Sequence, residues 1–193
     1  MINQMNINIL IQLLLTMIVF TNCKQKNDSS NESYIISKNS LGRIKIGMTK
    51  KEIQNQFNNY RFEKAYNYEY DIDDEEEGIL IIEKGDTLAY AWTKYNTDTI
   101  IGISCLSEKL LTKTGIHVGM EIAELEKKYS GLIVVPSMYD ENTEYMYLEK
   151  EEIELVFKSY KGKRVGIYKN EKSLYDGTNL YDKTRKINRI NLR

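Results

Sequence analysis

Hydrophobic positions follow two different patterns along the chain. Residues 9–20 form an almost continuous apolar run, and no side chain from residue 1 to residue 22 is charged. Beyond residue 43, short apolar stretches alternate with polar positions and are separated by Gly and Asp residues, a pattern that predicts strands joined by turns. The sequence therefore divides into a short apolar leader and a strand-rich globular part.

The leader has the layout of an export signal. Its apolar run is shorter than the roughly 20 residues that cross a bilayer, and it ends at Thr21-Asn22-Cys23, after which the sequence becomes polar. An apolar segment that stops at a processing site and continues as a polar linker is typical of secretory signals. We therefore expect residues 1–22 to be a signal peptide and residues 23–40 to begin with the processed Cys and continue as a flexible tether.

Cys23 resembles the lipobox cysteine of bacterial lipoproteins, and the preceding Phe-Thr-Asn is similar to the looser lipoboxes of Bacteroidetes-type bacteria. The resemblance implies that Cys23 carries the lipid, with palmitate among its acyl chains. Several acyl chains hold a protein firmly on a bilayer. It also implies an outer membrane lipoprotein of the cell envelope, facing either the periplasm or the outside. A plain signal peptide or an uncleaved anchor with an incidental Cys is the alternative.

One segment of the globular part occurs twice, at an offset of 72 residues. Residues 44–57 and 116–129 both contain an alternating Ile-x-Ile or Ile-x-Val followed by Gly-Met and then Glu-Ile or Glu-Leu. The alternation predicts a strand, the Gly a tight turn, and the following apolar spacing a short helix. Matching positions are Ile44 and Ile116, Ile46 and Val118, Gly47 and Gly119, Met48 and Met120, Glu52 and Glu124, Ile53 and Leu125, and Phe57 and Tyr129.

Strand-like runs follow each copy of the motif. We therefore predict an α+β fold of two tandem helix-plus-antiparallel-sheet repeats, the first over residues 41–110 and the second over residues 111–193. Turn signals at residues 84–86, 161–163 and 176–177 separate the runs. The predicted strands are 66–72, 78–83, 87–93, 99–106, 132–135, 144–148, 153–160, 164–168 and 187–192.

The Ile-x-Ile-Gly-Met-x-x-x-Glu-Ile/Leu pattern resembles the opening of the BamE/SmpA/OmlA lipoproteins and the repeats of β-lactamase inhibitor protein, a BLIP-like fold. The resemblance covers about 14 residues per copy (44–57 and 116–129). It implies a protein that acts through protein–protein contacts. We expect a non-enzymatic protein-binding module of unknown partner, and the alternative is a structural or assembly factor of the outer membrane similar to BamE.

Composition removes several classes of chemistry. The chain has one His and two Cys, so it cannot assemble a zinc site from several His or Cys residues. Its formal net charge is -1. It also lacks the Gly spacing of phosphate-binding loops. We expect no catalytic residues, no cofactor and no nucleic-acid partner. With Cys23 lipidated, Cys105 has no cysteine to pair with and is expected to be a small buried residue.

Charged residues gather in two segments of opposite sign. Residues 69–86 hold nine acids and one Lys, and within them Asp71, Asp73 and Glu75 are weak candidates for a hard cation such as calcium. A solvated hairpin tip is the alternative. Residues 158–193 hold 11 Lys or Arg and three acids. This basic segment could meet anionic lipid head groups or an acidic partner, or the two segments could partly compensate each other.

The remaining candidates are His117 and the tyrosines. His117 alternates with Ile116 and Val118, so its side chain is expected on the opposite, exposed side of the strand. Tyrosines are common both at binding hot spots and on sheets, which leaves open a contact surface or ordinary packing. The tyrosines considered are Tyr66, Tyr68, Tyr70, Tyr90, Tyr95, Tyr139, Tyr145 and Tyr147.

Overall fold

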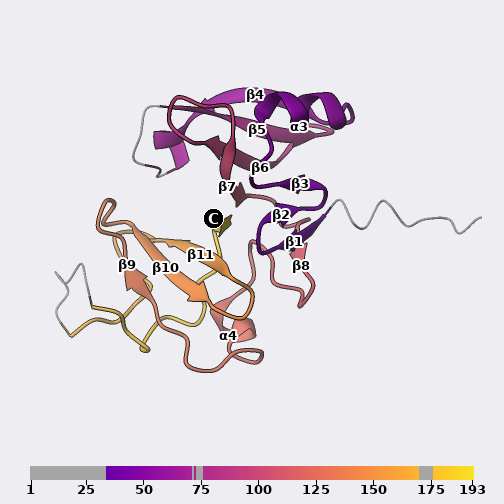
Figure 1. Cartoon of the computed structure of the whole chain (residues 1–193). Helices are drawn as coiled ribbons and strands as arrows, with labels where there is room; N and C mark the ends of the chain where they lie inside the picture. Colours follow the sequence, from indigo (N-terminus) through magenta and orange to yellow (C-terminus); the bar gives the residue numbers. More distant parts are fainter. Residues whose placement is uncertain (1–33, 71, 73–75, 170–175) are drawn as a thin grey trace, which may run out of the picture.

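A computed structural model describes residues 34–193 except 71, 73–75 and 170–175. The predicted signal peptide and Cys23 lie outside these residues. The described chain folds around one eight-stranded sheet in the order β4-β5-β6-β7-β12-β11-β10-β9 and one small four-stranded sheet in the order β3-β2-β1-β8 (Figure 1). No helix in these residues has the length and apolar character to cross a membrane.

The large sheet consists of two antiparallel meanders joined by their last strands. The first is β4 (Arg61–Tyr66), β5 (Glu77–Glu83), β6 (Asp86–Thr93) and β7 (Ile100–Cys105), and the second is β9 (Val135–Pro136), β10 (Thr143–Leu148), β11 (Ile153–Lys158) and β12 (Arg189–Leu192). Strands β7 and β12 pair antiparallel, with Ile190 opposite Cys105 and Leu192 opposite Ile103. From the central pair outward, the strands of each half therefore follow one another in reverse order of sequence, β7 to β4 on one side and β12 to β9 on the other.

The small sheet lies beside this central pair of strands (Figure 1). It contains β1 (Ile35–Ser37), β2 (Ser40–Leu41), β3 (Ile44–Lys45) and β8 (Leu111–Thr112). Strand β1 pairs antiparallel with β2 and parallel with β8, so it ties the start of the described chain to the middle. Residues 35–37 and 40, at the end of the predicted tether, thus belong to a sheet.

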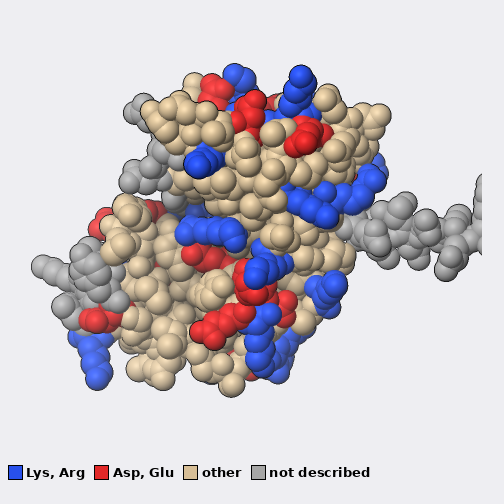
Figure 2. All heavy atoms as spheres, viewed as in Figure 1, with Lys and Arg blue, Asp and Glu red and all other residues tan. Residues whose placement is uncertain are grey.

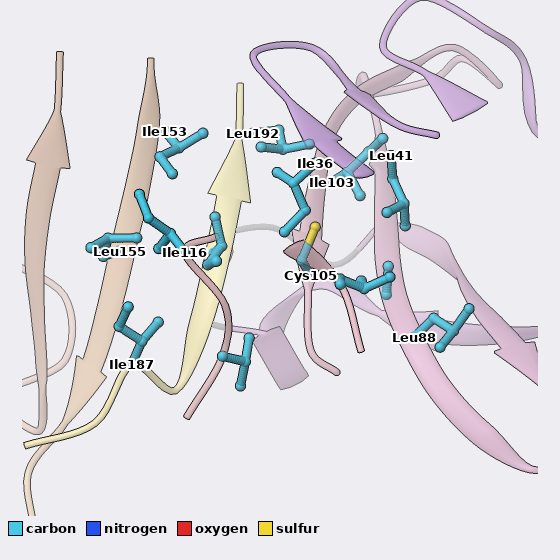
Figure 3. Close-up of a cluster of buried hydrophobic side chains, with 14 of the residues drawn as sticks. Ile36, Leu41, Leu88, Ile103, Cys105, Ile116, Ile153, Leu155, Ile187 and Leu192 are labelled. Atoms are coloured by element: carbon cyan, nitrogen blue, oxygen red, sulfur yellow. The ribbon is translucent and has the colours of Figure 1, made fainter. Parts of the chain in front are cut away.

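One hydrophobic core joins both halves of the chain. Figure 3 shows Ile36 and Leu41 of the small sheet pointing toward Ile103 and Cys105 of β7, with Leu192 of β12 beside them. All five side chains are at most 3% exposed. Burial of apolar area on this scale is the main force that holds the two sheets together.

The prediction of an α+β fold made of two tandem helix-plus-antiparallel-sheet repeats is wrong. Strands are the main regular structure of the described residues, and the helices there are α3 (Lys50–Gln56), α4 (Ile122–Leu125) and the single 3₁₀ turn η1 (Asn67–Tyr70). A helix of seven or four residues covers little of a sheet. The two meanders also share one continuous sheet rather than forming one sheet each.

The two Gly-Met segments nevertheless lie in matching surroundings. The amide of Gly47 donates to the carbonyl of Ile100 at 2.8 Å, and the amide of Gly119 donates to the carbonyl of Ile187, also at 2.8 Å. The amides of Ile100 and Ile187 return bonds to the carbonyls of the two methionines at 2.8 and 3.0 Å. Both glycines have positive φ, +95° and +88°, where a side chain would be strained.

The helices that follow these turns begin differently. Thr49 accepts a hydrogen bond from the amide of Glu52 and its own amide donates to the Glu52 carboxylate at 2.7 Å, a complete capping box. Glu121, at the same place in the second half, makes no side-chain cap bond. This agrees with the greater length of α3.

Several predicted strands have close counterparts in β5, β6, β7, β10, β11 and β12. The predicted strand 66–72 is wrong, because residues 67–70 form η1 and the preceding residues 61–66 form β4. The predicted strand 164–168 is reduced to a single bridge between Gly166 and Tyr181. Residues 67–70 follow β4 and residues 164–168 follow β11, so in both places the chain has left the large sheet.

Candidate functional site

The large sheet has two chemically different faces. One face carries Ile103, Cys105, Ile190 and Leu192 and packs on the core. On the other face, paired residues form a row across the middle strands: Tyr90, Ser104, Asn191, Glu154 and Tyr147. This second face is where the chain presents polar and aromatic side chains outside the main core.

In the first half, the second face is covered. The ring of Tyr70 in η1 stacks on the ring of Tyr90 with centroids 4.0 Å apart and 12° between planes. Trp92 and Ala65 join Tyr90 in a separate small apolar cluster. As a result Tyr90 is fully buried and Trp92 is 6% exposed.

In the second half, the same face is buried near the centre of the sheet, where Val156 and Asn191 are at most 3% exposed, and is open at its β9–β10 end. Tyr147 is 59% exposed and Val135 is 39% exposed, and Tyr145, on the same side of β10, is half-buried. We call these three residues with Glu154 the β10 face. A hollow of about 510 Å³ lies beside it, lined in part by Ile133, Val135 and Tyr147.

A chain of polar contacts fixes the centre of this face. The Ser104 hydroxyl donates to Oδ1 of Asn191 at 2.7 Å, and Nδ2 of Asn191 donates to Oε1 of Glu154 at 2.8 Å. The guanidinium of Arg193 reaches the same Glu154 oxygen at 3.2 Å. Ser104 and Asn191 are nearly inaccessible, so these bonds satisfy groups that would otherwise be costly to bury.

A buried carboxylate, Glu144, organises the long connection between β11 and β12. Its side chain accepts hydrogen bonds from the backbone amides of Val165 and Gly166 and from the hydroxyl of Tyr168 at 2.7 Å. Burial raises the pKa of Tyr168, and the bond to Glu144 raises it further. Glu144 therefore acts as a fixed acceptor that shapes residues 164–168 and is aimed away from solvent.

The predicted cation ligands Asp71, Asp73 and Glu75 lie outside the described residues. Next to them, Glu77 pairs with Lys64 at 2.7 Å, and this contact lowers the pKa of its carboxyl. Elsewhere in the described part of the chain, no three His, Cys, Asp or Glu side chains gather in a way that could hold a metal ion.

Cys105 and His117 have local explanations. Cys105 is fully buried in the core, and burial raises the pKa of its thiol, as expected for a packing residue rather than a nucleophile. His117 is half-buried, less open than the alternation predicts, and its Nδ1 lies 2.8 Å from the carbonyl oxygen of Val118.

The tyrosines divide between packing and exposure. Tyr90 and Tyr70 form the stacked pair that covers the first half. The others named in the sequence are exposed or half-buried, and Tyr66 and Tyr68 stack on each other at 5.4 Å. The exposed fractions are 43% for Tyr66, 60% for Tyr68, 69% for Tyr95, 76% for Tyr139 and 59% for Tyr147.

The basic segment 158–193 is partly neutralised by acids of the second half. Lys158 pairs with Asp140 at 3.0 Å, Lys183 with Glu126 at 2.7 Å, and Arg185 with Asp182 at 3.2 Å. Figure 2 shows Lys and Arg interspersed with Asp and Glu on the face it presents. These three acids lie outside the acidic segment 69–86.

Sequence reasoning did not single out Glu144, Glu154, Asn191 or Ser104. Glu154 and Asn191 each stand between two apolar residues of a strand, and a polar residue in that position is the sequence signal that could have identified them. Their alignment in one row depends on the pairing of strands that lie far apart in the sequence, and periodicity does not reveal that pairing.

Comparisons with known proteins identify a fold but no family. No protein family model matches the sequence, and no curated protein sequence matches it. Among solved structures, the chain is similar to the crystal structure of the uncharacterized protein YfeY from Escherichia coli, with a TM-score of 0.56 and 16% identity over 82% of this chain and 99% of that chain. The resemblance to BamE/SmpA/OmlA and β-lactamase inhibitor protein stays a prediction.

Proposed function

We propose that this chain is a lipid-anchored envelope protein that binds another protein through the β10 face. The observation that carries the proposal is the difference between the two halves. The second face of the sheet is covered by a stacked tyrosine in the first half, and it presents Tyr147 and Val135 to solvent in the second. Catalysis forms no part of this role.

The chemistry of the β10 face suits a protein partner. Tyrosine is enriched at binding hot spots because it buries a large rigid ring while its hydroxyl remains able to form a hydrogen bond. Tyr147 stands directly opposite Glu154, whose carboxylate is already oriented by Asn191 and Arg193. The face therefore offers an apolar surface around a fixed polar centre, which favours specific docking.

The anchor is supported by the leader sequence. The apolar run 9–20 ends at Cys23, and the described structure begins at residue 34 with strands that are part of the folded domain. An acyl anchor at Cys23 would hold the domain close to a bilayer and restrict its partners to those of the envelope.

Site-specific photo-crosslinking in living cells tests the contact. A benzoylphenylalanine placed at Tyr147 should give one adduct of defined mass, and the same group at Tyr95 should give none. Tyr95 is a matched control because it is a tyrosine of similar exposure, 69%, on the β6–β7 connection of the first half. Equal adducts at both positions, or none at Tyr147, would contradict the proposal.

Metabolic palmitate labelling tests the anchor. The wild-type protein and Cys105→Ala should both be labelled, because both contain Cys23 and Cys105 is buried. Cys23→Ala should not be labelled. Protease shaving of intact cells then reports whether the domain faces the periplasm or the outside. Unlabelled wild-type protein would refute lipidation, and it would leave the crosslinking result to decide the contact independently.

A further inference from the structure

Three large aliphatic side chains are exposed together at the outer end of the second half. Ile133, Ile167 and Leu180 are 52%, 61% and 60% exposed and line one hollow of about 530 Å³. Single exposed aliphatic residues are ordinary, but three that line one hollow make it a candidate interaction surface. Ile133 also lines the hollow beside the β10 face, so the two surfaces meet at that residue.

Lysines lie on the same side of the second half as this cluster. Lys169 lines the same hollow, and Lys163 lines an adjoining one that includes Ile167. Lys161 is exposed in the preceding turn, with its amine 5.1 Å from the ring centre of Tyr160. We call Ile133, Ile167, Leu180, Lys161, Lys163 and Lys169 the Ile167 surface.

Among the residues that the structure describes, the acids near this surface leave it basic. The carboxylate of Glu144 is buried and accepts hydrogen bonds from the amides of residues 165 and 166. Asp182 pairs with Arg185 at 3.2 Å. Asp176 lines the hollow and is the one exposed acid among its lining residues. The three lysines therefore outnumber it.

The surface is held in shape by hydrogen bonds. The amide of Ile167 donates to the carbonyl of Leu180 at 2.7 Å, and the hydroxyl of Thr178 donates to the carbonyl of Ile167 at 2.9 Å. Glu144 fixes the backbone immediately before them. The aliphatic and basic side chains are thus presented together without a folding step on contact.

We propose that the Ile167 surface rests on anionic lipid head groups as a second membrane contact, beyond the anchor at Cys23. The inference rests on the proposed lipid anchor. Exposed aliphatic residues accompanied by lysines are the composition of interfacial membrane contacts, in which the lysines meet lipid phosphates and the aliphatic side chains enter the head-group boundary. This charge complementarity favours an anionic bilayer as the occupant.

The length of the tether permits the contact. Ten residues lie between Cys23 and residue 34, so the eleven steps from one to the other, at 3.3–3.6 Å each, reach at most about 40 Å. The radius of gyration of a domain of this size is about 15 Å. The extended tether is therefore comparable in length to the domain itself, which lets the domain turn on its anchor, and the composition of the Ile167 surface selects the face that docks.

An environment-sensitive fluorophore on the anchored protein tests the proposal. The mature lipoprotein, with Cys105→Ala, carries a nitrobenzoxadiazole label on Leu180→Cys or on Tyr95→Cys and is reconstituted in vesicles of phosphatidylcholine with or without phosphatidylglycerol. Emission from position 180 should shift to shorter wavelength only in the anionic vesicles. Emission from position 95 should stay the same in both.

A charge variant completes the test. Lys161→Gln, Lys163→Gln and Lys169→Gln together should abolish the shift, whereas Lys51→Gln, Lys84→Gln and Lys94→Gln, equally exposed, should retain it. Trp92 fluorescence checks that both variants are folded. Protein that floats with the vesicles without a shift at position 180 overturns the docking while the anchor stands, and protein that does not float overturns the anchor.

Discussion

The two halves of this molecule contain equivalent glycine turns, but they differ in how far one face of the large sheet is covered. In both, a glycine with positive φ bonds to the strand that leads to the centre of the sheet. In the first half, the connection between β4 and β5 folds over the sheet and buries Tyr90. In the second half, the long excursion lies between β11 and β12, and the sheet face keeps Tyr147 in solvent.

This difference shows how a shared frame supports distinct surfaces. The hydrogen bonds at the turns and the order of the strands fix the frame, while the length and position of one connection decide whether a face is closed or open. Loops on a rigid scaffold commonly carry function for this reason.

Removing the buried acceptor of the second half should have the largest effect. Glu144→Ala leaves two amides and the hydroxyl of Tyr168 without their acceptor, so we expect a loss of about 3 kcal/mol in the free energy of unfolding. Urea denaturation measures the loss. Glu149→Ala, an exposed acid at the end of β10, should change it by less than about 0.5 kcal/mol.

Hydrogen exchange locates the effect in Glu144→Ala. The amides of Val165 and Gly166 should lose protection, and the amide of Gly47 in the first half should keep it. An equal loss of protection in both halves would mean that Glu144 stabilises the whole sheet and not only the connection between β11 and β12.

Alanine at the two turn glycines should be next in size and nearly equal in the two halves. Gly47→Ala and Gly119→Ala each place a side chain at positive φ, which costs roughly 1–2 kcal/mol in stability. The added methyl meets no atom within 4 Å at Gly47 and meets only the flexible Glu108 side chain at Gly119. Thermal or urea unfolding checks this, and a large inequality would break the equivalence of the turns.

The helix caps should separate the halves. Thr49→Ala removes a complete capping box and should lower the free energy of unfolding by about 1 kcal/mol. Glu121→Ala removes no cap bond and should cost less than about 0.5 kcal/mol. If the two substitutions cost the same in urea denaturation, the cap does not account for the longer α3.

The last effect should appear only in acid. Burial tends to raise the pKa of Asp140, but hydrogen bonds from Thr143, the amide of Asn142 and Lys158 outweigh it and lower the pKa to about 2, from an ordinary value of 3.8. Because the folded pKa is the lower one, Asp140 stabilises the fold above about pH 4 and loses this effect as the pH falls toward 2. Unfolding curves of Asp140→Asn should show a weaker pH dependence in that window than those of the exposed Glu141→Gln.

The sequence predicts the strands better than their assembly. The alternation and turn signals locate β5, β6, β7, β10 and β11 within a few residues, because half-buried strands have a period of two. Strand β4 was missed because its exposed residues, including Arg61, Glu63 and Lys64, break the alternation, as charged residues on an edge strand do. The two-residue strands of the small sheet are too short to leave a pattern.

The wrong fold class has a physical cause. The 14-residue motif predicts a helix in each half, but propensity and spacing do not fix how far a helix extends, since tertiary packing decides it. Residues 126–128 continue as a turn instead of a second helical turn. The polar row and the Glu144 contacts join residues far apart in sequence, so they follow only from the paired strands.

Radical footprinting of tyrosines in intact envelopes tests the central claim most directly. Purified protein should be modified at both Tyr147 and Tyr95, since both are more than half exposed. In envelopes that contain the anchored protein and its partner at natural abundance, we predict that Tyr147 becomes protected and Tyr95 does not. Equal modification of Tyr147 in the two preparations would contradict the assignment of the β10 face as the contact surface.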